Sequence, residues 1–135
     1  MYGTYLSYME PESYRQKLKM NSDDRGSFTE FLHLQDKGQI SVNIIKPGIV
    51  KGNHWHHTKV EKFLVVRGNA VIKLRHMITG KVQEYTVSGE ELEVVDIPVG
   101  YTHNITNIGL DDLVTVIWAN EVFDKDRPDT YYEEV

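Results

Sequence analysis

The chain has 135 residues, of which 40% are hydrophobic and 26% charged, as in an ordinary globular protein of one domain. Its formal charge is −5 and it shows no basic patch, which argues against a nucleic-acid partner. It has no cysteine, so disulfides and cysteine metal sites are excluded. No apolar run approaches the ~20 residues of a membrane span, and the N-terminus lacks a signal pattern, so we expect a cytoplasmic protein without a membrane partner.

The first twenty residues show no clear periodicity. We expect an N-terminal arm or linker at 1–20, with at most one or two helical turns at 12–18. From Ser27 onward, segments rich in β-branched and aromatic residues alternate with turn residues. They predict strands at 27–34, 39–46, 60–67, 69–76, 81–88, 92–97, 102–107 and 113–119. Without a helical period between them, these strands predict an all-β sandwich or barrel, with one domain over 21–135.

The densest run of possible metal ligands lies near the middle of the chain. It follows the pattern G-x5-H-x-H-x4-E-x6-G from Gly48 and contains His54, His56 and Glu61. On a strand, residues i and i+2 project to the same side, so the two histidines should point together, away from His57. An isolated H-x-H pair is common in surface loops and by itself predicts little.

A second motif, Pro98-x-Gly100-x2-His103-x3-Asn107, adds a third histidine after several strands. We expect Asn107 to be structural, capping the turn. Three imidazoles and one carboxylate suit Zn²⁺, Mn²⁺, Fe²⁺, Ni²⁺ or Co²⁺, with one or two positions open for water or substrate. The two motifs together predict one divalent metal bound by His54, His56, Glu61 and His103.

These motifs resemble the signature of the cupin superfamily, whose members fold as small β-barrels. The usual second motif has a glycine six residues before the proline, where this chain has Leu92; the difference changes a turn and should not remove a ligand. Longer stretches resemble the C-terminal cupin domain of CapF-type enzymes of bacterial capsular polysaccharide synthesis. They read KMNSDDRGSFTEF, KGNHWHHTK, DIPVGYTHNI and RPDTYYEEV, and the Tyr-rich start at 4–8 fits as well.

The resemblance implies a defined reaction. A cupin of this kind epimerises C3 of a UDP-linked 4-keto-6-deoxy-N-acetylhexosamine, on the route to UDP-N-acetyl-L-fucosamine. It would hold zinc through His54, His56, Glu61 and His103 and form a homodimer through the cupin. In the family, an NADPH-dependent reductase domain precedes the cupin and reduces the C4 ketone. This chain has no glycine-rich dinucleotide fingerprint, so we expect an excised domain or a stand-alone relative that acts with a reductase.

A shorter pattern, D-x-R-G-x-F-x-E from Asp23, resembles the cupin-shaped dTDP-4-keto-6-deoxyhexose 3,5-epimerases, which lack metal. That resemblance implies that Arg25 and Glu30 lie near the sugar or diphosphate of the substrate. The alternative is that Arg25-Gly26 only forms a turn before a strand.

Epimerisation beside a ketone also needs an acid–base residue and cations for the diphosphate. The candidates for proton transfer are Tyr101, His57, Lys73 and Glu30. The candidate cations are Arg25, Lys51, Lys73 and Arg75.

Two other functions fit the same ligand set. Metal cupins with three histidines and one glutamate include dioxygenases, isomerases and decarboxylases, which spacing alone does not separate. A non-catalytic module that binds sugar or regulates a partner is also compatible. Exchange of a carbon-bound proton with solvent would mark the epimerase, and oxygen consumption would mark a dioxygenase.

Overall fold

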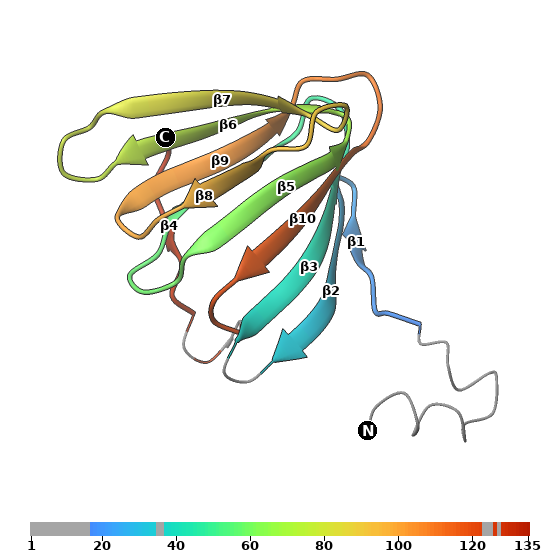
Figure 1. Ribbon diagram of the computed structural model, residues 1–135, viewed down its shortest axis with the longest axis horizontal. Coiled ribbons are helices and arrows are strands. Elements are labelled where there is room, and N and C mark those ends of the chain that lie inside the picture. Colours follow the sequence, from blue (N-terminus) through green and yellow to red (C-terminus); the bar gives the residue numbers. More distant parts are fainter. Residues whose placement is uncertain (1–16, 35–36, 123–125, 127) are drawn as a thin grey trace.

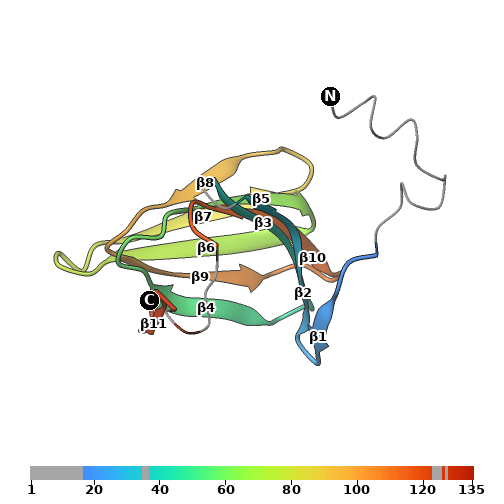
Figure 2. The same ribbon diagram turned by 90° about the horizontal axis from the view of Figure 1, so that it is seen from below.

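The computed structural model describes residues 17–34, 37–122, 126 and 128–135. All secondary-structure elements assigned to these residues are β-strands. No helix among these residues is long and apolar enough to cross a membrane. The strands form two antiparallel sheets that pack against each other, as Figures 1 and 2 show from two directions. The predicted all-β class is confirmed.

Six strands form the first sheet and five form the second. The first sheet has the spatial order β1 (Asn21–Asp23), β2 (Gly26–Leu34), β3 (Gly38–Ile45), β10 (Leu113–Ala119), β5 (Glu61–Arg67) and β8 (Val94–Ile97). The second has the order β11 (Tyr131–Tyr132), β4 (Val50–Trp55), β9 (Tyr101–Asn107), β6 (Asn69–His76) and β7 (Val82–Ser88). Strands distant in sequence are therefore neighbours, such as β4 and β9.

All eight predicted strands are present, and their ends differ from the predicted ones by no more than two residues. Three strands were not predicted. β1 and β11 are very short, and β4 has the sequence VKGNHW, whose Gly-Asn pair is typical of a turn. The suggested helical turns fall mostly on residues outside the described ranges, and residues 17–20 form neither helix nor strand. The boundary between arm and domain at residue 20 stays a prediction.

The interior between the sheets has an apolar part and a polar part. Alternate residues of β5, β6 and β9 supply buried apolar side chains such as Val65, Ile72 and Ile105. Full burial of each such side chain contributes about 1.5–3 kcal/mol. Three inner positions of β3 are instead polar, since Gln39, Ser41 and Asn43 are buried there. Because buried polar groups need partners, a polar inner wall suits a site that binds a ligand.

Candidate metal centre

A β-bulge in β4 puts the side chains of Lys51 and His54, three positions apart, on the same face of the strand. Lys51 pairs with Ile105 of β9, and His54 pairs with His103, so three positions on β4 match two on β9. Regular alternation would send one of the two side chains outward. The extra residue lies at 52–53, where the register shifts and both residues have positive φ, of 107° and 59°. Such bulges re-aim side chains beside functional sites, and this one turns both Lys51 and His54 inward.

Four side chains then converge between the sheets. His54 on β4, His56 just beyond it, Glu61 on β5 and His103 on β9 each place a ligand atom within 4.8 Å of the others. His56 Nε2 lies 2.8 Å from Glu61 Oε1, and His103 Nε2 lies 3.4 Å from the same oxygen. Because β5 belongs to one sheet and β4 and β9 to the other, the cluster bridges the two sheets.

Electrostatics favour the metal-binding protonation states. The pKa of His54 is lowered to about 4, first because burial disfavours the charged ring and then because His103 and His56 lie close to it. Burial alone would raise the pKa of the Glu61 carboxyl, but the nitrogens of His103 and His56 hold it well below its usual range. At neutral pH the cluster therefore offers a neutral His54 ring and a carboxylate, which are the forms that bind metal.

The hydrogen bonds of the cluster determine how its histidine rings are oriented. His56 Nδ1 lies 2.5 Å from the carbonyl oxygen of Asp129. A carbonyl can only accept, so Nδ1 carries a proton, and Nε2 on the other side of the ring faces Glu61 Oε1 at 2.8 Å. Within the described residues, neither ring nitrogen of buried His103 has a hydrogen-bond partner. A divalent cation could be shared by Nε2 of His56, the His103 ring and the Glu61 carboxylate, so the residues present fit a zinc-type ion.

The cluster forms one wall of a cavity of about 370 Å³ between the sheets. Arg25 and Lys51 bring positive charge to this cavity, and Phe28 gives it an apolar surface. The Lys51 ammonium donates a 2.8 Å hydrogen bond to Asn43 Oδ1 on the opposite sheet. Its pKa is lowered, first by partial burial and then by the charge of Arg25. The cavity can therefore accept an anionic ligand beside the histidines.

A second cavity of about 310 Å³ shares Glu61 and Phe28 with the first. Glu30, Ser41 and Lys59 also line it. Hydroxyl, carboxylate and ammonium groups at this wall suit a ligand that carries hydroxyl or amide groups.

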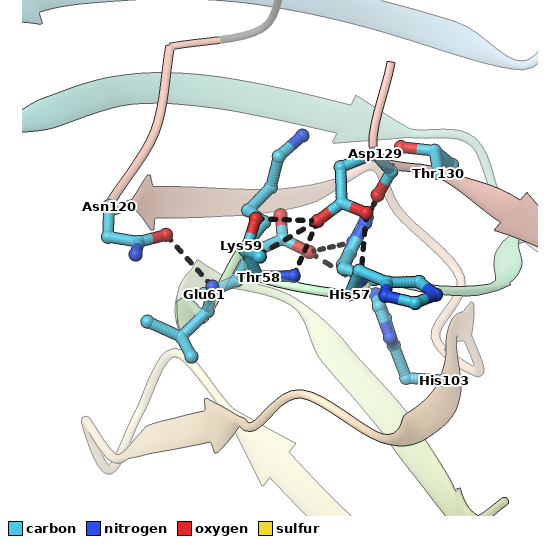
Figure 3. Close-up of polar contacts among 10 residues, drawn as sticks. His57, Thr58, Lys59, Glu61, His103, Asn120, Asp129 and Thr130 are labelled. Carbon is cyan, nitrogen blue, oxygen red and sulfur yellow. Dashed lines mark hydrogen bonds and ion pairs between the residues drawn. The ribbon is translucent and has the colours of Figure 1, made fainter. Parts of the chain in front are cut away.

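Asp129–Val135, which we call the C-terminal clamp, lies along β4 beside the cluster. Its strand β11 pairs with β4, with Tyr131 opposite Trp55 and Tyr132 opposite His54. The Asp129 carboxylate accepts hydrogen bonds from the backbone N–H groups of residues 57–59, at 2.8, 2.7 and 3.0 Å (Figure 3). Burial raises the pKa of this carboxyl, but these donors outweigh burial and hold it well below its usual range. The clamp thus holds the loop that follows His56.

Three of the four predicted acid–base residues, Tyr101, His57 and Lys73, line neither cavity. Tyr101 stands at the start of β9, edge-on to His76 at a centroid distance of 5.0 Å. His57 is exposed in the loop after β4. Lys73 lies on β6 with its ammonium 3.5 Å from a carboxylate oxygen of Glu84. None of the three is among the described residues that line the two cavities.

The predicted substrate-binding residues divide into two groups. Arg25 lines the first cavity and Glu30 lines the second, so the structure brings both close to the cluster. Arg75 lines neither cavity. Its Nη2 instead lies 2.7 Å from Oε2 of Glu133 in the C-terminal clamp.

Two residues near the cluster were not selected from the sequence. Asn43 could have been noticed, because Gln39, Ser41 and Asn43 put polar side chains at alternate positions of β3, between apolar residues. Asp129 gave no local signal, because it lies 73 positions from His56 and only the folded chain joins them.

The comparisons with known proteins agree with this geometry. Residues 21–131 match the model of the polysaccharide biosynthesis C-terminal domain. The chain is 47% identical, over 97% of its length, to a Pseudomonas aeruginosa protein named UDP-2-acetamido-2,6-beta-L-arabino-hexul-4-ose reductase. The crystal structure of the Staphylococcus aureus capsular polysaccharide assembling protein CapF superposes on 99% of the chain with a TM-score of 0.96 and 63% identity. The resemblance to the CapF-type cupin is confirmed.

These relatives are longer than the chain, which covers 35% of the Pseudomonas protein and 39% of the Staphylococcus one. A Lactobacillus farciminis oxalate decarboxylase superposes on 85% of the chain with a TM-score of 0.65, and the chain covers 33% of that protein. At 18% sequence identity this match shows the fold alone. The predicted cupin fold is thereby confirmed. The chain belongs to the polysaccharide biosynthesis C-terminal domain family.

Proposed function

We propose that the chain is a zinc-binding cupin that epimerises C3 of a UDP-linked 4-keto-6-deoxy-N-acetylhexosamine in bacterial capsular or surface polysaccharide synthesis. The observation that carries the proposal is the convergence of His54, His56, Glu61 and His103 beside a cavity that contains Arg25 and Lys51. The names of the Pseudomonas and Staphylococcus relatives, a UDP-sugar reductase and a capsule-assembling protein, support the choice of substrate and pathway.

The reaction is difficult because removal of the C3 proton leaves negative charge on the C4 oxygen. When bound, zinc supplies Lewis-acid stabilisation of such an oxygen, which is worth several kcal/mol. His54, His56, Glu61 and His103 would hold the ion at the cavity wall. A general acid–base group contributes roughly 10²–10⁴-fold on top of this.

Charged residues of the cavities would bind and orient the substrate. Arg25 and Lys51 are suited to the diphosphate, since cations form strong charge-assisted hydrogen bonds with phosphate oxygens. Glu30 lines the second cavity and is in place to contact the sugar. Among the proton-transfer candidates, Glu30 thus lies in a cavity, whereas Tyr101, His57 and Lys73 would need the substrate to extend beyond both cavities.

The proposal extends to partners and location. A reductase, as a domain or a separate chain, would consume the epimerised ketone, in keeping with the reductase name of the Pseudomonas relative. We also propose a homodimer in the cytoplasm. Sedimentation of the purified chain tests the dimer.

Proton NMR in D₂O tests the reaction directly. The chain loaded with zinc is mixed with a UDP-4-keto-6-deoxy-N-acetylhexosamine, and the C3 proton signal is followed with time. Loss of that signal, abolished in His54→Ala, is the expected result. No exchange with zinc fully bound would contradict the epimerase and favour a sugar-binding or regulatory module, unless added reductase restores exchange. Oxygen consumption with Fe²⁺ would favour a dioxygenase instead.

A further inference from the structure

The C-terminal clamp contacts the chain on both sides of the segment that contains His54 and His56. After them, Asp129 accepts the three backbone hydrogen bonds of residues 57–59. Before them, Asn53 in the bulge receives hydrogen bonds from the clamp: Glu133 N–H donates to its carbonyl at 2.8 Å, and Val135 N–H to its Oδ1 at 3.2 Å. The clamp therefore fixes both ends of the segment that presents His54 and His56.

Asp129 also contacts the ring of His56 itself. Its backbone carbonyl lies 2.5 Å from Nδ1, while its carboxylate holds the loop that begins one residue later. Figure 3 shows Asp129 beside this loop, with Glu61 and His103 nearby. One residue thus accepts the Nδ1 proton of His56 and fixes the backbone that carries the ring.

We infer that the C-terminal clamp is a positioning element of the metal centre, in which Asp129 holds Nδ1 of His56 so that Nε2 is aimed at Glu61. In metal sites, partners that orient a histidine in this way set its basicity and direction, and their loss weakens metal binding. The inference rests on the proposed metal centre. It goes beyond the proposed metal centre in one respect: metal affinity would depend on residues that are distant in the sequence and contribute no ligand atom.

The alternative is that the clamp only covers a sheet edge. In that case its loss would lower the melting temperature but would leave the affinity of the folded protein for zinc unchanged. The inference instead predicts a change in affinity and in the His56 tautomer.

The first experiment compares zinc affinities. Asp129→Asn removes the carboxylate charge and leaves the backbone carbonyl, and a chain ending at residue 128 removes the whole clamp. Glu93→Gln, an exposed carboxylate outside the clamp, is the control for the loss of one charge. In competition with a chromophoric chelator, we expect zinc binding to weaken about tenfold in Asp129→Asn and up to about a hundredfold in the truncated chain. Glu93→Gln should match the wild type.

The second experiment reads the tautomer without metal. Long-range ¹H–¹⁵N correlation spectra of the metal-free protein should show the His56 proton on Nδ1 in the wild type and in Glu93→Gln. In Asp129→Asn, a mixture with the Nε2–H form is expected.

Each outcome decides a separate question. Folded Asp129→Asn and truncated chains that bind zinc as tightly as the wild type would overturn the inference. If the truncated chain does not fold, Asp129→Asn and the tautomer spectra decide it. If the wild type binds no zinc at all, the proposed function fails, and the metal-free spectra still show whether Asp129 sets the His56 tautomer.

Discussion

Glu61 contacts two histidines of the cluster and lines both cavities. Glu61→Gln keeps the shape of this side chain but removes its charge. Because the carboxylate is the anionic member of the ligand set, we expect zinc affinity to fall at least about tenfold. Metal content after dialysis against a buffered zinc concentration measures the effect. Unchanged metal content would remove Glu61 from the site, and Glu84→Gln on β7 is a matched control.

His54 makes the stability of the metal-free protein depend on pH. Its pKa is about 4 in the folded chain and 6.5 in the unfolded one. Between these values the unfolded chain binds more protons, so the free energy of unfolding should decrease as the pH falls from 6.5 to 4. The loss due to His54 is at most about 3 kcal/mol. Urea denaturation of chelator-treated protein at pH 7, 6 and 5 measures it.

A variant separates this residue from the other titrating groups. His54→Gln should show a smaller decrease in stability over the same pH range. An unchanged slope in His54→Gln would mean that another group is responsible.

The bulge in β4 is the element on which the geometry of the cluster depends. A Cβ added at Gly52 would lie 2.8 Å from the His103 carbonyl oxygen, at a φ of +107°. Gly52→Ala should therefore push β4 away from β9, and both strands carry histidines of the cluster. Gly80 has a φ of +73°, and a Cβ added there would meet nothing within 4 Å. Gly80→Ala is therefore a control for backbone strain alone.

We expect Gly52→Ala to lose both stability and zinc affinity, and Gly80→Ala to lose only about 1 kcal/mol of stability. Thermal unfolding and zinc titration of the two variants measure this difference. Equal effects in the two would show that the close approach of β4 to β9 is unimportant.

Among the elements, those with clear alternation could be predicted from sequence, whereas β4 could not. The strands at 69–76 and 113–119 were predicted with the observed ends, because apolar and charged residues alternate in the first and β-branched residues fill the second. In β4, Gly52-Asn53 resembles a turn because the bulge needs residues that tolerate positive φ. The spacing of the two motifs selected His54, His56, Glu61 and His103, but their convergence depends on this bulge and on pairing between distant strands. The sequence did not distinguish Lys51 from the other candidate cations. The hydrogen bond from its ammonium to Asn43 on the opposite sheet shows that its side chain crosses the interior.

At the scale of the whole molecule, β1 is the first strand of the described residues. Residues 17–20 are exposed and β1 starts at Asn21, so few contacts tie this stretch to the sheets. A chain of residues 21–135 should therefore unfold cooperatively and bind zinc with the affinity of the full chain. Calorimetry and zinc titration of both chains test this. Loss of cooperative unfolding would place residues 1–20 within the domain.

The contact between Asp129 and His56 also sets an order of events during synthesis. The two residues are 73 positions apart, so at 5–20 residues per second the ribosome needs roughly 4–15 seconds to pass from one to the other. During that interval the histidines of β4 have left the ribosome before the residue that orients them. If the clamp acts as inferred, a nascent chain can hold zinc only weakly, and tight loading waits until the last strand has docked.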